Sequence, residues 1–149
     1  MSTEVSTLSF ARLEVGQQLP PIEVVVTQPV IDRAALTHLD FNPVHTAVDW
    51  CTRAQVFGTP KTVAHGMFTM SQMASVIERT WGPLGASIRR MDAKFTKPVK
   101  VGTTVRFEGS VWELHPHSPG NHSVVVSLKG TDDEGTTVSV GTFRVAVPD

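Results

Sequence analysis

"HGMFTMSQMASVIERTWG", residues 65–82, is the segment that decides the fold. It is long enough for several helical turns, and no charged residue follows His65 until Glu78. A helix that is apolar almost all round has to be buried by other parts of the structure. We therefore expect a central helix that ends near Gly82-Pro83 and is wrapped by the rest of the protein.

Four segments after this helix alternate apolar and polar residues, a pattern typical of strands with one buried face. The turn signals "KVG", "HPHSPGN" and "DDEG" separate them, which indicates an antiparallel meander. The expected strands are residues 87–99, 103–114, 122–131 and 136–147. A fifth strand, residues 21–27, precedes the helix and is rich in β-branched residues. This order predicts the α+β class, with a sheet curled around the central helix.

Two shorter helices are expected between the first strand and the central helix. Residues 28–39 carry a proline in the first turn and can place apolar side chains on one face. Residues 48–57 form the second helix, which a Gly-Thr-Pro sequence ends. A loop is expected between the two helices, where Asn42-Pro43 is a turn signal and the proline stiffens the chain.

The length and charge of the chain limit the classes of function. Its 149 residues suit a single domain with its own core, which we expect to span residues 1–149. A net charge of -1 offers no basic excess for nucleic acid or an anionic membrane. Cys51, as the sole cysteine, cannot form an internal disulfide. The first ten residues lack the features of a secretory signal, so we expect a cytoplasmic protein.

The segment "LDFNPVHTAVD", residues 39–49, places Asp40 and His45 five positions apart in the expected loop. A histidine titrates near neutral pH, so it can give and take a proton during turnover. A nearby carboxylate can orient the imidazole or carry a second proton, and the amide of Asn42 can hold a water molecule or a carbonyl group. The alternative is structural: Asp40 caps a turn and His45 is a hydrogen-bonded loop residue.

A second segment, "TVAHGMFTM", residues 62–70, places Gly66 at the start of the central helix. Backbone N–H groups are unpaired there, and the helix dipole is positive. Glycine lets a ligand approach the backbone closely, so this N–H can stabilise an oxyanion. His65 is either a ligand contact or a helix cap. The structural alternative for Gly66 is a simple tight turn.

Taken together, these segments resemble the MaoC-like family of (R)-specific enoyl-thioester hydratases and 3-hydroxyacyl-thioester dehydratases, which have the hot-dog fold. "DFNPVH" matches the D-x-N-P-[LIV]-H core of that family, and "FGTP" and "AHGM" resemble later landmarks. Residues 94–111, "KFTKPVKVGTTVRFEGSV", resemble the F-x-x-P-V-x-x-G-D strand pair, with Thr103 where an aspartate is common. The resemblance covers residues 8–147.

The resemblance implies a single hot-dog domain that adds water across trans-2-enoyl thioesters or removes it from (R)-3-hydroxyacyl thioesters. Asp40 and His45 are then the catalytic pair, and Asn42, His65 and the N–H of Gly66 position the water or the thioester. No metal or redox cofactor is implied. Coenzyme A or acyl carrier protein carries the acyl group. The implied partner is an identical chain in a homodimer, or a related hot-dog subunit in a heterodimer.

Two departures from the family pattern keep other functions open. His38-Leu39 stands where Ser-Gly is usual before the catalytic aspartate, which changes the backbone conformations available there. Ala74 occupies the place of a common serine on the central helix, with serines on either side. The alternatives are a hot-dog acyl-thioesterase and a non-catalytic subunit that binds acyl thioesters.

The remaining signals favour structural roles. Met67, Met70, Met73 and Met91 have the spacing of core residues, although methionine also suits an acyl tunnel. The tryptophans, Trp50, Trp81 and Trp112, are expected to pack in the interior. Cys51 has no base spaced to activate it. Residues 115–122, "HPHSPGNH", are expected to form a hairpin loop, since the histidine spacing fits no common metal site.

Overall fold

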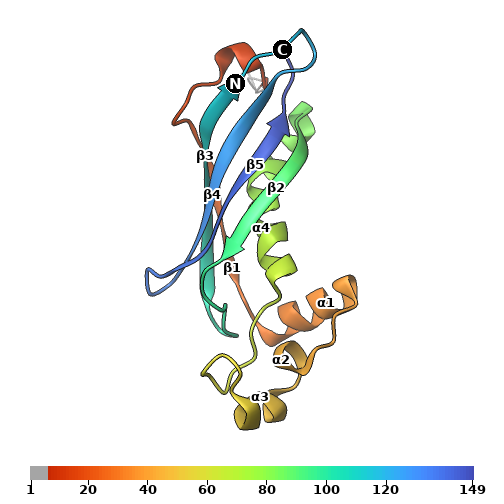
Figure 1. Ribbon diagram of the computed structural model, residues 1–149, viewed down its shortest axis with the longest axis vertical. Coiled ribbons are helices and arrows are strands. Elements are labelled where there is room, and N and C mark those ends of the chain that lie inside the picture. The colour runs from red at the N-terminus through yellow and green to blue at the C-terminus, as the bar shows by residue number, and fades with distance from the viewer. Residues whose placement is uncertain (1–6) are drawn as a thin grey trace, which may run out of the picture.

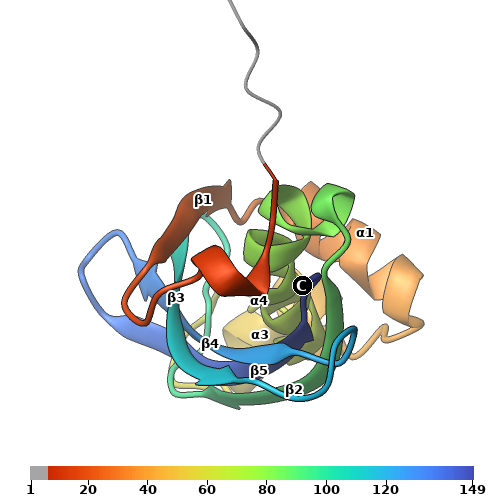
Figure 2. The same cartoon turned by 90° about the horizontal axis from the view of Figure 1, so that it is seen from above.

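A five-stranded antiparallel sheet curls around one long helix in the computed structural model, which describes residues 7–149 (Figure 1). The strands are β1 (Gln18–Val25), β2 (Ser87–Phe95), β3 (Thr104–His115), β4 (Ser123–Asp132) and β5 (Thr137–Ala146). Their order in the sheet is β1-β3-β4-β5-β2. Figure 2 shows the sheet bending around helix α4 (Gly66–Thr80). The α+β class and the wrapped central helix are confirmed.

Helix α4 packs one face against the concave side of the sheet. Its residues Met73, Val76 and Ile77 are almost fully buried. Burial of such a side chain contributes about 2 kcal/mol. The sheet leaves room for them: at Gly141 in β5, a Cβ atom would lie 2.9 Å from Cε of Met73. A glycine at this position therefore lets the helix approach the sheet closely.

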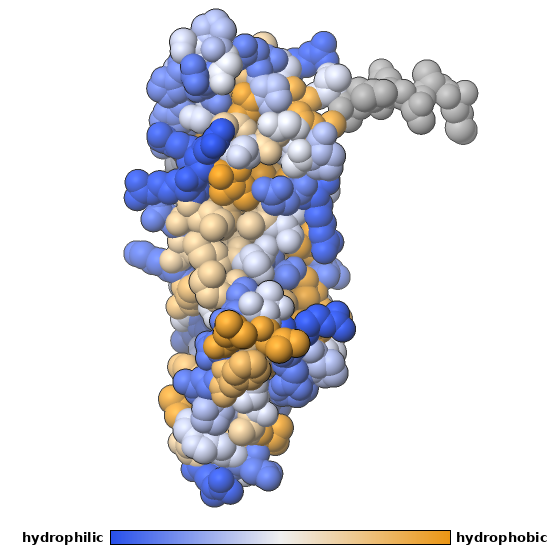
Figure 3. Space-filling model, turned by 90° about the vertical axis from the view of Figure 1, so that its right-hand side faces the viewer, coloured by the Kyte–Doolittle hydropathy of each residue, from blue (hydrophilic) through white to orange (hydrophobic). Residues whose placement is uncertain are grey.

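The opposite face of α4 is open in the single chain, which corrects the expectation of burial all round. Met67 is 57% exposed and Ser71 is also exposed. Figure 3 shows the side of the molecule on which α1, α4 and β2 lie, and apolar surface is uncovered along it between hydrophilic patches. The apolar composition of the helix is thus only partly explained by contacts within one chain.

Three helices form a lobe beside the N-terminal end of α4 (Figure 1). They are α1 (Gln28–His38), α2 (Pro43–Thr46) and α3 (Val48–Ala54). The first matches the expected helix. The expected loop instead contains α2, because the side chain of Asn42 caps a helical turn that begins at a proline. The third helix is shorter than expected, since Gln55 adopts a left-handed conformation that ends it.

Several smaller expectations need correction. Trp81 is buried, but Trp112 is 61% exposed at a bulge in β3, so it does not pack in the interior. Of the methionines, Met73 belongs to the core, whereas Met67 and Met91 are exposed. Two 3-10 turns, η1 (Phe10–Arg12) and η2 (Gly82–Leu84), were not predicted. No helix within residues 7–149 has the length and apolar character needed to cross a membrane.

Candidate active site

Asp40 follows a strained residue at the end of helix α1. Leu39 has φ 53° and ψ 38°, a left-handed conformation that favours glycine. The Asp40 N–H donates to the carbonyl oxygen of Ala35 at 3.0 Å, which closes the helix end. Leu39 thus adopts a conformation that a glycine would adopt without strain. The leucine is 78% exposed, and this conformation costs it about 1–2 kcal/mol.

The carboxylate of Asp40 has two distinct surroundings. Its Oδ1 accepts the N–H of Asn42 at 3.2 Å, which is the turn-capping role considered as the structural alternative. Its Oδ2 lies 3.8 Å from Nε2 of His45. The Asp40 side chain is about half exposed, and that of His45 is 13% exposed. One oxygen thus fixes the turn while the other faces the histidine.

Hydrogen bonding defines the tautomer of His45. Its Nδ1 lies 2.7 Å from the carbonyl oxygen of Val63, which can only accept, so Nδ1 carries the hydrogen. In the neutral ring, Nε2 then has a lone pair on the side of Asp40. The 3.8 Å gap between Nε2 and Oδ2 is too long for a direct hydrogen bond. A water molecule at this gap can contact both groups.

His65 occupies the N-cap position of α4, but its side chain lies behind the pair of Asp40 and His45. Its side chain makes no capping hydrogen bond to α4. Its ring stacks on that of His45, with centroids 3.8 Å apart and planes inclined by 27°. Nε2 of His65 lies 2.9 Å from the carbonyl oxygen of Asp40 and must donate to it. The residue is 2% exposed, and its Nδ1 is buried without a hydrogen-bond partner.

An apolar cavity of about 190 Å³ adjoins His45 and the start of α4. Gly66, Thr69 and Phe95 contribute to its wall. The Gly66 N–H makes no hydrogen bond within residues 7–149, as expected for the first residue of a helix. The ring of Phe95 lies over this glycine, where a Cβ atom would be 2.9 Å from its Cε2. A side chain at position 66 would therefore force the ring of Phe95 or the helix end to move.

Asn42 does not direct its carbonyl oxygen into the cavity. Its Oδ1 accepts the N–H of Val44 at 3.1 Å and thereby caps α2. On the central helix, the hydroxyl groups of Ser71 and Ser75 donate to carbonyl oxygens of α4 itself, and Ala74 is half-buried. No central-helix serine thus stands in for the one that is usual in the family.

Asp40, His45 and His65 each place one potential ligand atom for a metal ion within 4.8 Å of the others. A nitrogen lone pair lies in the plane of its imidazole ring, so these two stacked rings direct their lone pairs within separate planes that are inclined by only 27°. They do not converge on one ion without rotation of a ring. The donor set is therefore a poor fit for a metal, and an acid–base role suits it better.

The other candidate features do not form a second catalytic cluster within residues 7–149. Cys51 is buried, with Sγ 3.4 Å from the carbonyl oxygen of Pro43. The histidines at 115–122 lie in or beside the β3–β4 hairpin; His115 contacts Glu113, and His122 contacts Asp149.

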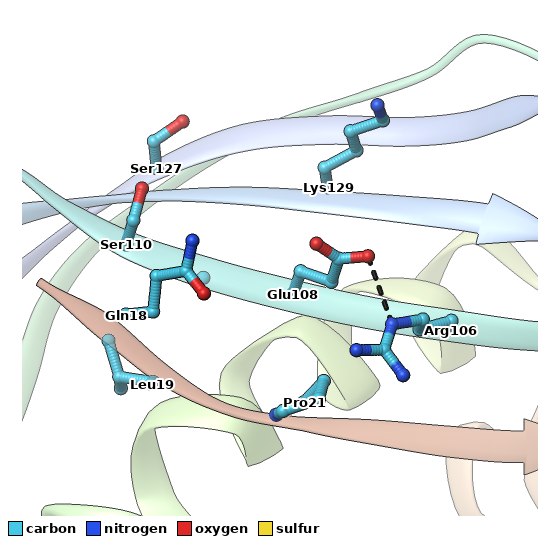
Figure 4. Close-up of a pocket in the computed structure, with 9 residues that line it drawn as sticks. Gln18, Leu19, Pro21, Arg106, Glu108, Ser110, Ser127 and Lys129 are labelled. Carbon is cyan, nitrogen blue, oxygen red and sulfur yellow. Dashed lines mark hydrogen bonds and ion pairs between the residues drawn. The ribbon is translucent and has the colours of Figure 1, made fainter. Parts of the chain in front are cut away.

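A polar hollow of about 220 Å³ lies over β1, β3 and β4. Figure 4 shows Ser110, Ser127 and Lys129 turned away from the helix behind the sheet, whereas Leu19, which also lines the hollow, belongs to the core. Ser110 and Ser127 lie at one end of the hollow. Arg106 pairs with Glu108 at 3.0 Å at the other end. It contains no histidine and no cysteine, so it offers neither an imidazole base nor a thiol nucleophile.

The sequence predicted Asp40, His45, Gly66 and His65, and the structure brings these four together. It did not predict that Val63 sets the tautomer of His45 or that Phe95 covers Gly66. The available signal for Phe95 was the "KFTKPV" stretch, which places an aromatic residue before a proline in the segment that resembles the family. The contact of Val63 is made by its backbone carbonyl group, which every residue type has, so the sequence does not reveal it.

Comparisons with known proteins show what the chain is similar to. Residues 12–133 match the family model described as "MaoC like domain". A 3-hydroxybutyryl-CoA dehydratase of Methylorubrum extorquens is 32% identical over 117 residues, covering 78% of this chain and 71% of that protein.

Solved structures share the fold. An unliganded (R)-hydratase of Pseudomonas aeruginosa superposes with a TM-score of 0.83 and 26% identity, covering 96% of this chain and 87% of that one. A chain of the ChsH1–ChsH2 complex of Mycobacterium tuberculosis superposes with a TM-score of 0.76 and 22% identity, covering 90% and 98%.

Proposed function

This chain belongs to the MaoC-like domain family, and on that basis we propose that it is a hydro-lyase that interconverts trans-2-enoyl thioesters and (R)-3-hydroxyacyl thioesters. The observation that carries the proposal is the 3.8 Å gap between Oδ2 of Asp40 and Nε2 of His45, beside an apolar cavity that starts at Gly66. The family match over residues 12–133 and the single sheet support one domain over the whole chain.

The reactive water lies between the two catalytic side chains in this proposal. One hydrogen of the water is held by Oδ2 of Asp40, and the other is transferred to Nε2 of His45 as the oxygen adds to C3 of the enoyl group. The imidazolium that forms is stabilised by the Asp40 carboxylate and by the Val63 carbonyl. His45 then returns the proton to C2, so the product gains one OH and one H.

The negative charge that develops on the thioester oxygen is held at the start of α4. The Gly66 N–H has no partner among residues 7–149, and the positive end of the helix dipole adds to its effect. A fixed donor of this kind contributes about 2.7–4 kcal/mol to transition-state stabilisation in other enzymes. The thioester therefore needs no metal ion to stabilise charge at this position.

His65 and Asn42 are positioning residues rather than substrate contacts in this mechanism. His65 holds the Asp40 backbone through one hydrogen bond and supports one face of His45. Asn42 caps α2, the helix that carries His45. Both residues thus preserve the gap in which the water is bound.

We also propose that a second copy of this chain completes the molecule along β2. Strand β2 pairs only with β5 within residues 7–149, so its other edge is open. If the β2 strands of two copies pair antiparallel about Met91, Arg90 of each copy lies opposite Asp92 of the other copy. Arg90 and Asp92 pair with each other at 2.8 Å within one chain, and the same two charges are compatible with pairing across the edge of a homodimer.

The activity is tested with purified protein and crotonyl-CoA by following the absorbance of the conjugated enoyl thioester. Wild-type protein is expected to form the (R)-3-hydroxy product, whereas Asp40→Asn and His45→Ala lower kcat by about 10²–10⁴-fold. Asp40→Asn keeps an acceptor for the Asn42 N–H, so the turn persists. Release of free thiol without hydration would instead identify a thioesterase, and binding without turnover would identify a non-catalytic subunit.

A further inference from the structure

A second cavity, of about 410 Å³, adjoins the apolar cavity of the proposed active site. Phe57, Lys97 and Pro98 line both cavities, so the two are neighbours that meet at these residues. The inner cavity is mainly apolar, whereas the outer one is lined largely by charged side chains. This arrangement suits a substrate with an apolar acyl end and a charged carrier end.

Three lysines line the outer cavity: Lys61, Lys97 and Lys100. They come from two segments that the backbone fixes side by side. The Ala64 N–H donates to Val99 at 2.8 Å, and the Val101 N–H donates to the carbonyl oxygen of Thr62 at 3.0 Å. The first of these segments also includes Val63, whose carbonyl oxygen holds His45. The lysines and the proposed catalytic histidine are therefore anchored on one rigid backbone unit.

The ammonium groups of these lysines form no direct ion pair within the described residues. Carboxylates do line the same cavity, at Asp132, Asp133 and Glu134. Asp132 is occupied by its own turn, where Oδ1 accepts the N–H groups of Glu134 at 3.0 Å and Thr136 at 2.8 Å.

We propose that this lysine-lined cavity binds the phosphate groups of coenzyme A, which makes coenzyme A rather than a carrier protein the acyl carrier. The inference rests on the proposed function and extends it to the substrate class. A small phosphate group can lie against the lysines without meeting the exposed carboxylates of Asp133 and Glu134. The broad acidic surface of a carrier protein would be placed against those carboxylates and be repelled by them.

Phe57 supports the same assignment. It is 50% exposed at the boundary of the two cavities, where an uncharged pantetheine arm would pass between the thioester and the phosphates. An exposed aromatic ring gives such an arm an apolar contact. The lysines then act at the far end of the substrate, away from the reacting carbon atoms.

The test compares two thioesters that differ only in the phosphate-bearing nucleotide: crotonyl-CoA and crotonyl-pantetheine. Replacing Lys61, Lys97 and Lys100 by glutamine together is expected to raise KM for crotonyl-CoA about tenfold, with kcat unchanged. KM for crotonyl-pantetheine is expected to stay the same. Added salt should raise KM for crotonyl-CoA in the wild type and have little effect in the triple variant. The control is Lys129→Gln, which removes the positive charge of an exposed lysine on β4.

The possible outcomes separate the inference from the proposed function. Equal effects on both thioesters, or no effect on either, would overturn the inference while the hydratase activity stands. Turnover of a crotonyl-carrier protein with a lower KM than crotonyl-CoA would also overturn it. If wild-type protein turns over neither thioester, the proposed function fails. Calorimetry with free coenzyme A then tests the lysine-lined cavity by itself. Binding that is weaker in the triple variant supports the cavity as a phosphate site, and absence of binding rejects it.

Discussion

The imidazole rings of His45 and His65 are stacked, with centroids 3.8 Å apart, and the two histidines contact Asp40 in different ways. His45 faces the carboxylate, while His65 donates to the backbone carbonyl oxygen of the same residue. His65 thus joins the end of α1 to the start of α4. The geometry of the catalytic pair depends on a third residue that is buried and lies behind His45.

Replacing His65 separates its two contacts. His65→Phe keeps a ring to stack on His45 but loses the hydrogen bond to Asp40, whereas His65→Gln keeps a donor and loses the stacking. We expect each variant to lower kcat about tenfold, with KM for crotonyl-CoA changed less than twofold, because the residue positions the pair and does not touch the substrate. A rise in KM with unchanged kcat would show that His65 contacts the thioester.

Leu39 and Leu36 provide a matched test of backbone strain. Both are exposed leucines three residues apart, but Leu36 lies within α1 and Leu39 is left-handed. Leu39→Gly should raise the free energy of unfolding by about 0.5 kcal/mol, because relief of strain exceeds the added entropy of the unfolded chain. Leu36→Gly should lower it by about 1 kcal/mol. Urea denaturation measures both, and the same sign for both would refute the strain at Leu39.

The contact between Gly66 and Phe95 predicts a paired effect on activity. Gly66→Ala places a methyl group 2.9 Å from the Phe95 ring, so the ring or the helix end has to move. We expect kcat to fall about tenfold because the oxyanion donor shifts. Combining Gly66→Ala with Phe95→Leu makes room for the methyl group and should recover part of kcat. A double-mutant cycle in steady-state kinetics measures the coupling, and strict additivity would show that the two residues act independently.

Sequence patterns predicted the elements that repeat with a regular period. The alternation along β3, β4 and β5 gave strand positions within a few residues, and the uncharged run after His65 gave α4. The stacking of His65 on His45 was not predictable, because it depends on how α2 and the start of α4 meet in space. His65 as a residue type fits a cap, a ligand contact or a buried support equally well.

The open face of α4 was missed for a different physical reason. An apolar helix has to be covered, but the pattern of apolar residues does not say whether the same chain or a second copy covers it. From the sequence, Leu39 differed from the family pattern only in standing where a glycine is usual. Its left-handed backbone shows that the turn before Asp40 is imposed by the surrounding structure, which overrides the preference of the residue.

Charge at the centre of the β2 edge tests the proposed homodimer. Met91 is 44% exposed, and in the proposed pairing it lies on the twofold axis beside its counterpart. Met91→Asp would set two carboxylates directly opposite each other, which destabilises strand pairing. We expect wild-type protein to sediment as a dimer and this variant to shift towards monomer. Val15→Asp, which adds the same charge at another exposed apolar residue, should remain dimeric; a dimer that persists in Met91→Asp would place the interface elsewhere.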